Sequence, residues 1–183
     1  MSLSTFTTLH VVISLIGIAS GVIVLLRRCR KPTVWGLTTL FLVTTLAASV
    51  TGLLYLVSFP RFRLGHGIGV ASLVVFAPTV LALWRHRLAS APSHGVWRGI
   101  WVTGAATLLY LNAFIAVLQA FGKIGFLRTL PATSIGSPLF IAHLLVLAIS
   151  VWLAIHAFTG LRPGGAPRRI RRPRPLRVAD RWN

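Results

Sequence analysis

Hydrophobic runs of about twenty residues recur along the chain and are separated by short segments rich in Arg, Gly and Pro. A run of that length is long enough to cross roughly 30 Å of hydrocarbon as an α-helix. The pattern predicts five such helices, over residues 7–26, 35–59, 67–84, 100–121 and 139–160. The sequence therefore predicts an all-α integral membrane protein, with a five-transmembrane-helix bundle over residues 1–161.

Composition and charge narrow the classes of function. Of the 183 residues, 55% are hydrophobic, which is too many for a soluble domain of this size. The single acidic residue is Asp180, near the C-terminus, so the predicted spans contain no carboxylate. Carboxylate proton relays, catalytic triads with Asp and glutamate-bound metals are excluded from the spans, and we predict no catalytic residue. The one cysteine, Cys29, excludes an internal disulfide.

The distribution of basic residues predicts the orientation. Fifteen of the 19 Lys and Arg residues follow the first, third and fifth spans, whereas the other two connections hold four. Because cytoplasmic segments of membrane proteins carry the excess of basic residues, we predict the N-terminus outside and the C-terminus in the cytoplasm. Residues 162–183, rich in Arg, Pro and Gly, are expected to form a disordered cytoplasmic tail that contacts anionic lipid headgroups. Topology alone explains the charge of this tail, so nucleic acid is not an expected partner.

Polar and small residues lie on one face of four of the predicted helices. Polar groups at membrane depth cost free energy unless they face protein, so these faces are expected to meet other helices. The stripes are His10, Ser14, Gly17 and Gly21; Thr38, Thr45, Ser49 and Gly52; Asn112, Ala116 and Gln119; and His143, Ser150 and Ala154.

The predicted orientation gathers three imidazoles and two amides in the outer half of the bundle. These candidate cofactor-binding residues are His10, His66, Asn112, Gln119 and His143. Either they hold a ligand or they hydrogen-bond neighbouring helices. One ligand that fits is a quinone, a lipid headgroup or a small polar solute, held by the amides and a histidine. The connection from Phe121 to Pro138 is expected to lie along the outer interface and to cover this cluster.

Haem b and a metal ion are the other candidate occupants. His143 and His156 are thirteen residues apart, about 20 Å along a helix, a spacing similar to that of two stacked haems in membrane cytochromes b. In this scheme His86 would pair with His156, and His10 or His66 with His143. Thirteen residues also turn a helix by about 220°, so the two imidazoles of the last span should point in nearly opposite directions. A Zn or Cu site of His10, His66 and His143 would lack a carboxylate or thiolate to orient its ligands. The sequence does not decide whether a metal ion is bound.

Several sequence blocks together resemble a known group of proteins. LHVVISLIGIASGVIVL, FLVTTLAASVTGLLY, HGIGVASLVV and LYLNAFIAVLQAF, the last followed by PATSIGSP, are similar to a family of small, uncharacterised, multi-spanning inner-membrane proteins of bacteria. The resemblance runs from Leu9 to about Leu153, and its most specific part is the LYLN…Q block. It implies a bacterial inner-membrane protein and no particular reaction. Members often carry Gln at the position of His143, so His143 is a departure and a shared axial-ligand role for it is in doubt.

Two functions are compatible with these observations. The first is a non-catalytic membrane component, or an accessory subunit of other membrane proteins, with a polar His/Asn/Gln cluster. The alternative is an electron-transfer subunit that binds b-type haem or quinone. A channel or transporter fits less well, because the spans show neither charged residues nor an inverted repeat.

Overall fold

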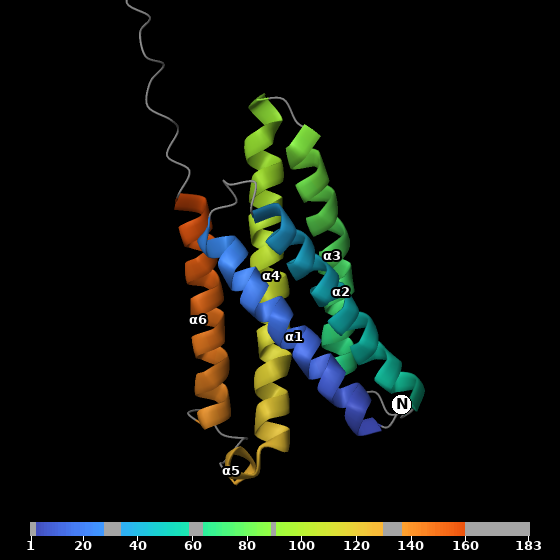
Figure 1. Ribbon diagram of the computed structural model, residues 1–183. Helices are drawn as coiled ribbons and strands as arrows, with labels where there is room; N and C mark the ends of the chain where they lie inside the picture. Colours follow the sequence, from blue (N-terminus) through green and yellow to red (C-terminus); the bar gives the residue numbers. More distant parts are fainter. Residues whose placement is uncertain (1–2, 28–33, 59–63, 89–90, 130–136, 160–183) are drawn as a thin grey trace, which may run out of the picture.

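The computed structural model of the chain describes residues 3–27, 34–58, 64–88, 91–129 and 137–159, which are almost entirely helical. The helices are α1 (Leu3–Leu26), α2 (Val34–Ser58), α3 (Leu64–Leu88), α4 (Ala91–Lys123), α5 (Gly125–Arg128) and α6 (Pro138–Thr159) (Figure 1). All except α5 are long and apolar enough to cross a membrane. The prediction of five helices with the length and composition of membrane spans is therefore confirmed. Cys29 and the predicted tail lie outside the described residues.

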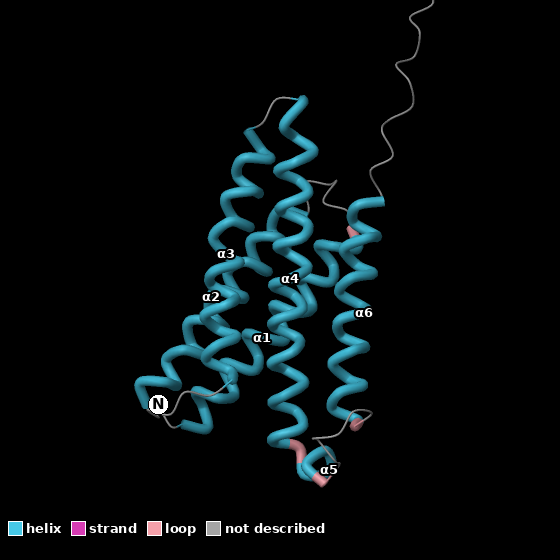
Figure 2. Tube along the Cα trace, turned by 180° about the vertical axis from the view of Figure 1, so that it is seen from behind, coloured by secondary structure: helices cyan, strands magenta, loops and turns pink. Residues whose placement is uncertain are grey.

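Helix α4 occupies the middle of the bundle. Helices α3 and α6 lie on its two sides, and α1 and α2 cross one face of this layer (Figure 1). The view from behind shows the same order of α3, α4 and α6 (Figure 2). Helix α1 packs against α2, α4 and α6, and α3 packs against α2 and α4. The candidate side chains therefore lie on α4 itself or on helices that contact α4.

The tightest packing surrounds the first half of α4. Trp101, Val102, Ala105 and Leu108 each expose 1% or less of their surface. They belong to a core cluster that also includes apolar side chains from α1, α2, α3 and α6. In contrast, every residue of 111–121 is only half-buried. The bundle is therefore packed more loosely around the end of α4 that carries Asn112 and Gln119.

Glycines allow close approach of helices at two seams. A Cβ built at Gly17 or Gly21 would come within 3.1 Å or less of side chains from α2, and at Gly21 the obstacle is the ring of Phe41. The expectation that the stripe with Gly17 and Gly21 meets another helix is therefore confirmed. At Gly104 of α4, a Cβ would lie 3.0 Å from both Cβ and Cγ2 of Thr79 on α3. The sequence analysis did not identify this second contact.

Helices α3 and α4 extend beyond their predicted spans. Helix α3 has 25 residues, where residues 67–84 were predicted, and α4 has 33, where residues 100–121 were predicted. At 1.5 Å per residue α4 is about 50 Å long, more than the roughly 30 Å of a hydrocarbon core. The prediction used only the apolar composition, whereas a helix continues as far as its backbone hydrogen bonds extend. As a result the α3–α4 hairpin projects beyond the ends of α1 and α6 (Figure 1).

Helix α6 begins at a capping signal. Pro138 occupies the first helical position, where its missing N–H leaves no helical bond unmade. The hydroxyl oxygen of Ser137 accepts a hydrogen bond from the backbone N–H of Phe140, at 3.3 Å. Its carbonyl oxygen accepts one from the N–H of Ile141, at 3.0 Å. Ser137 therefore acts as the N-cap and fixes the point at which the chain enters α6.

The outward face of α6 is broad and apolar. Leu145, Ile149, Trp152 and Ile155 each expose between 54% and 58% of their surface. A water-facing surface rarely presents a patch of this kind, whereas lipid tails or the apolar face of another helix match it well. The inward face carries the buried residues Ser150, Leu153 and Ala157.

Candidate functional site

The candidate side chains lie toward one end of the bundle. His10 and His143 follow the starts of α1 and α6, His66 opens α3, and Gln119 precedes the end of α4. These helix ends all lie in the lower half of Figure 1. The alternating direction of the helices thus places these side chains toward the same end of the bundle. Whether they form one site depends on the seams between helices into which they point.

His10 joins α1 to α2. Its Nδ1 lies 2.7 Å from the hydroxyl oxygen of Thr51, and its ring is 6% exposed. The Thr51 hydroxyl proton is directed to the carbonyl oxygen of Ala47, at 2.7 Å. The Nδ1–H of His10 is therefore the donor to Thr51. Gly52 faces this imidazole, and a Cβ built there would be in ordinary van der Waals contact with His10 Cε1, at 3.7 Å.

Asn112 faces the seam between α4, α1 and α2. Its Nδ2 donates a hydrogen bond of 3.4 Å to the hydroxyl oxygen of Thr45, which is 1% exposed. A Cβ on Gly17 would lie 3.3 Å from the same Nδ2, so the glycine makes space for the amide. Asn112 therefore faces other helices as predicted, and its amide donates to a protein oxygen.

Gln119 and His66 have different surroundings from those of Asn112. The Oε1 of Gln119 accepts a hydrogen bond of 3.2 Å from Lys123 Nζ one turn later, which is an ordinary pair on a helix surface. His66 is 6% exposed near the start of α3. One turn later Gly69 packs against Leu53 of α2. His66 therefore lies near the contact between α3 and α2.

His143 has a chemically unusual environment. Its Nδ1 lies 2.8 Å from the carbonyl oxygen of Leu139. A carbonyl can only accept, so Nδ1 carries the proton, and in the neutral ring Nε2 presents a lone pair. The ring lies 4.1 Å, centroid to centroid, from the ring of Phe114 on α4, at an interplanar angle of 58°. The Nε2 atom is buried and, among the described residues, is the one buried side-chain nitrogen or oxygen without a hydrogen-bond partner.

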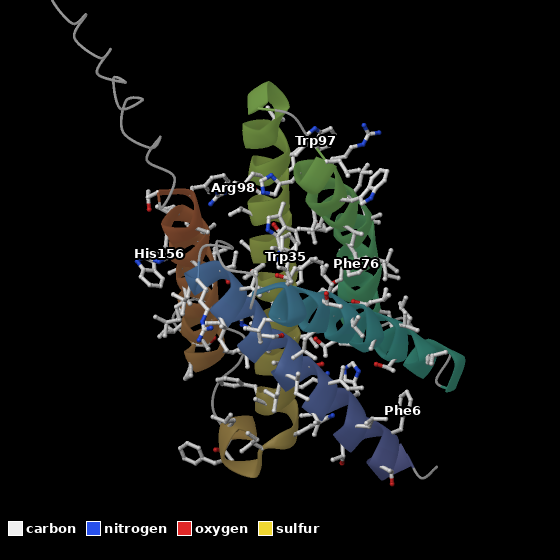
Figure 3. The ribbon with its side chains drawn as sticks, turned by 45° about the horizontal axis from the view of Figure 1, so that its top comes forward. Phe6, Trp35, Phe76, Trp97, Arg98 and His156 are labelled. Carbon is white, nitrogen blue, oxygen red and sulfur yellow. The ribbon has the colours of Figure 1, made fainter. Side chains whose placement is uncertain are left out.

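His156, on the same helix, has the opposite orientation. Its ring stacks on Trp152, with centroids 5.4 Å apart and an interplanar angle of 20°. In Figure 3 its side chain points away from the other helices. The predicted opposite orientation of the two imidazoles on α6 is confirmed. The pairing of His156 with His86 is not formed, because α4 lies between α3 and α6 (Figure 1).

The candidate residues are therefore distributed over different seams. Within the part of the chain that the structure describes, no group of three or more His, Cys, Asp or Glu side chains is placed to hold a metal ion. His10 and Asn112 bond to threonines on α2, and His143 faces α4. The sequence analysis missed Phe114 as the neighbour of His143 and Leu139 as its acceptor. The four-residue spacing from Leu139 to His143 was available as a signal for the second contact.

The structure describes the beginning and the end of the connection between α4 and α6. Its first turn forms α5, where Phe126 exposes 74% of its surface. Residues 130–136 lie outside the described residues. The prediction that this connection covers the polar residues therefore remains a prediction. Comparisons of the chain with protein-family models, with curated proteins and with solved structures found no match.

Proposed function

We propose that this chain is a multi-pass, non-catalytic protein of the bacterial inner membrane that holds a membrane-soluble ligand at His143. In this proposal the N-terminus lies outside and the C-terminus in the cytoplasm. Five apolar helices and the excess of basic residues in alternate connections support the location. The ligand rests on one observation, the buried Nε2 of His143 without a partner.

The chemistry of this nitrogen defines the ligand class. A buried acceptor that lacks a donor costs about 1–3 kcal/mol. The fixed proton on Nδ1 makes Nε2 a hydrogen-bond acceptor, so the complementary group is a donor, and we take this donor to be a hydroxyl. A hydroquinone, a phenol or a lipid alcohol carries such a hydroxyl on an apolar body that dissolves in the membrane. Phe114 belongs to the half-buried second half of α4, so this wall of the seam is loosely packed.

The alternative, electron transfer through b-type haem, depends on the same nitrogen. An imidazole Nε2 lone pair is a common axial ligand of haem iron. A second axial imidazole would have to come from another helix, because His156 faces away from His143. His10 lies in the α1–α2 seam, where its Nδ1–H donates to Thr51. The hydroxyl ligand requires no second residue, so we favour it.

The apolar outer face of α6 supports a role as an accessory subunit. Lipid tails and an apolar helix of another membrane subunit both match the apolar character of its exposed side chains. The seam at His143 lies on the opposite, inward side of α6. A partner on the outer face and a ligand on the inner face therefore do not compete for the same surface.

The test compares the purified wild type with His143→Phe and with the matched control His156→Phe. His156 is a half-buried histidine of the same helix that faces away from the seam. Bound small molecules are extracted with organic solvent and identified by mass spectrometry. We expect one hydroxyl-bearing compound to be retained by the wild type and by His156→Phe, and to be lost from His143→Phe. The same compounds in all three proteins would contradict the proposal.

A visible absorption spectrum separates the haem alternative. Reduced-minus-oxidised bands that are present in the wild type and lost in His143→Phe would show that the ligand at His143 is haem and not a hydroxyl-bearing compound. An unchanged circular dichroism spectrum of His143→Phe ensures that loss of a ligand is not loss of the fold.

A further inference from the structure

A guanidinium group lies between two indole rings at the end of the bundle opposite His143. The Cζ atom of Arg85 is 5.8 Å from the ring centroid of Trp84 and 5.8 Å from that of Trp97. Trp84 precedes Arg85 near the end of α3, whereas Trp97 lies in the second turn of α4. Both distances are within the range of cation–π attraction. The contacts therefore hold the cation at the seam of the α3–α4 hairpin, next to Trp97, which Figure 3 labels.

Within the part of the chain that the structure describes, the hydrogen-bonding capacity of this guanidinium is unused. Arg85 is exposed, and within the described residues no carbonyl, hydroxyl or amide oxygen accepts a hydrogen bond from it. A guanidinium carries five N–H donors in a planar fork that matches the oxygens of a phosphate. The chain has a single acidic residue, Asp180, against 19 basic ones. The described residues include no carboxylate, so the anion that complements Arg85 comes from elsewhere than these helices.

The position of the group identifies the source of that anion. The apolar stretch of α3 ends at His86 and that of α4 begins at Gly95, so Arg85 lies at the boundary of the apolar length. Trp84 is 55% exposed beside it, in the position that interfacial tryptophans take at the level of lipid headgroups. A guanidinium at that depth meets phospholipid phosphates. The net charge of +18 repels the ammonium of a zwitterionic headgroup and favours a headgroup with net negative charge.

From these contacts we infer that Trp84, Arg85 and Trp97 form a binding site for the phosphate of an anionic phospholipid, such as phosphatidylglycerol. The phosphate oxygens accept the N–H groups of Arg85, and the two indoles hold the guanidinium plane and pack against the glycerol and the first acyl carbons. The site lies at the opposite end from His143, so it is independent of the proposed ligand. It belongs to the bundle and does not require the basic segment 162–183.

The experiment measures lipid binding to the full-length protein in detergent by native mass spectrometry. The added lipids are phosphatidylglycerol and phosphatidylcholine with the same acyl chains. The variants are Arg85→Gln, Arg85→Lys and the matched control Arg27→Gln. Arg27 is an exposed arginine that directly follows α1, and within the described residues it makes no such aromatic contact. Glycerol 3-phosphate serves as a water-soluble source of the same phosphate group.

We expect the first phosphatidylglycerol to bind about tenfold or more weakly to Arg85→Gln than to the wild type, because charge-assisted hydrogen bonds are lost. Arg85→Lys should show an intermediate loss, because it keeps the charge without the planar fork. Arg27→Gln should bind like the wild type, and phosphatidylcholine should bind weakly to every protein. Equal losses in Arg85→Gln and Arg27→Gln would overturn the site, since net charge alone would then explain binding. Full competition by glycerol 3-phosphate would overturn the assignment to a lipid.

Discussion

Replacing Gly104 by alanine tests whether α3 and α4 are held together by close backbone contact. A Cβ at this position would lie 3.0 Å from both Cβ and Cγ2 of Thr79 and would overlap its hydroxyl oxygen. Thr79 is 1% exposed, and its hydroxyl donates to the Val75 carbonyl oxygen at 2.6 Å. Carbon atoms in contact normally lie about 3.5–4.0 Å apart. Either the two helices separate by roughly 0.5–1 Å or Thr79 leaves its rotamer.

The expected magnitude follows from two opposing effects. Overpacking of a well-packed interior costs typically about 1–3 kcal/mol. Alanine in place of glycine gains up to about 1 kcal/mol of helix propensity. Gly95, on the same helix, provides the matched control, because a Cβ there would meet nothing within 4 Å. Gly104→Ala should therefore be less stable than Gly95→Ala by about 2 kcal/mol, roughly a thirtyfold difference in the unfolding equilibrium.

The assay is equilibrium unfolding in mixed micelles with increasing sodium dodecyl sulfate. Tryptophan fluorescence reports on the transition, because Trp101 is 1% exposed in the core beside Gly104. Thr79→Ala, introduced into the Gly104→Ala protein, should recover part of the loss, since it removes two of the three close atoms. A double-mutant cycle isolates this coupling. Equal stability of Gly104→Ala and Gly95→Ala would refute the close contact.

Two further predictions concern the His10 contact and the orientation. Thr51→Val removes the hydroxyl oxygen that meets His10 Nδ1 and should lower the free energy of unfolding by about 0.6 kcal/mol, the average for an interhelical hydrogen bond in membranes. Thr107→Val, whose hydroxyl donates to the carbonyl oxygen of Thr103 on its own helix, should change it less in the same unfolding assay, and the reverse order would contradict the interhelical role. We expect a cytoplasmic reporter fused after Asn183 to be active and a periplasmic reporter at the same position to be inactive. Activity of the periplasmic reporter would overturn the proposed topology.

The periodicity of the sequence predicted which faces of the helices are buried. His10, Ser14 and Gly17 are buried on one face of α1, because polar groups and small residues at a spacing of three or four residues share a side of a helix. Asn112 faces α1 and α2 for the same reason. Gln119 shares this face by spacing, yet its oxygen bonds to Lys123. Spacing determines the side of the helix on which a side chain lies, whereas the residues that it meets there depend on how the other helices pack.

The sequence predicted that the candidate residues lie toward one end of the bundle. It did not predict which of them lie together. Helix direction and the position of each residue along its span placed His10, His66 and His143 toward one end of the bundle. Their separation into different seams follows from the order of helices around α4, which no local pattern encodes. The contact of His143 with Phe114 depends on the placement of α6 beside α4. The single group that proved chemically distinctive, the Nε2 of His143, could not be recognised before that placement.

By itself the sequence determined that there are five helices of membrane-crossing length, because the length and composition of an apolar run decide whether it can cross hydrocarbon. It also determined the absence of carboxylates from the spans and the face that each of α1, α2 and α6 buries. The tertiary structure alone decided that α4 is central and that Gly104 meets Thr79. It also brought Trp97 to Arg85 and left His143 Nε2 without a partner. The physical reason is that helices of nearly uniform apolar character select their neighbours by the shape of the packed surfaces and by a few polar contacts, and these exist only once the surfaces meet.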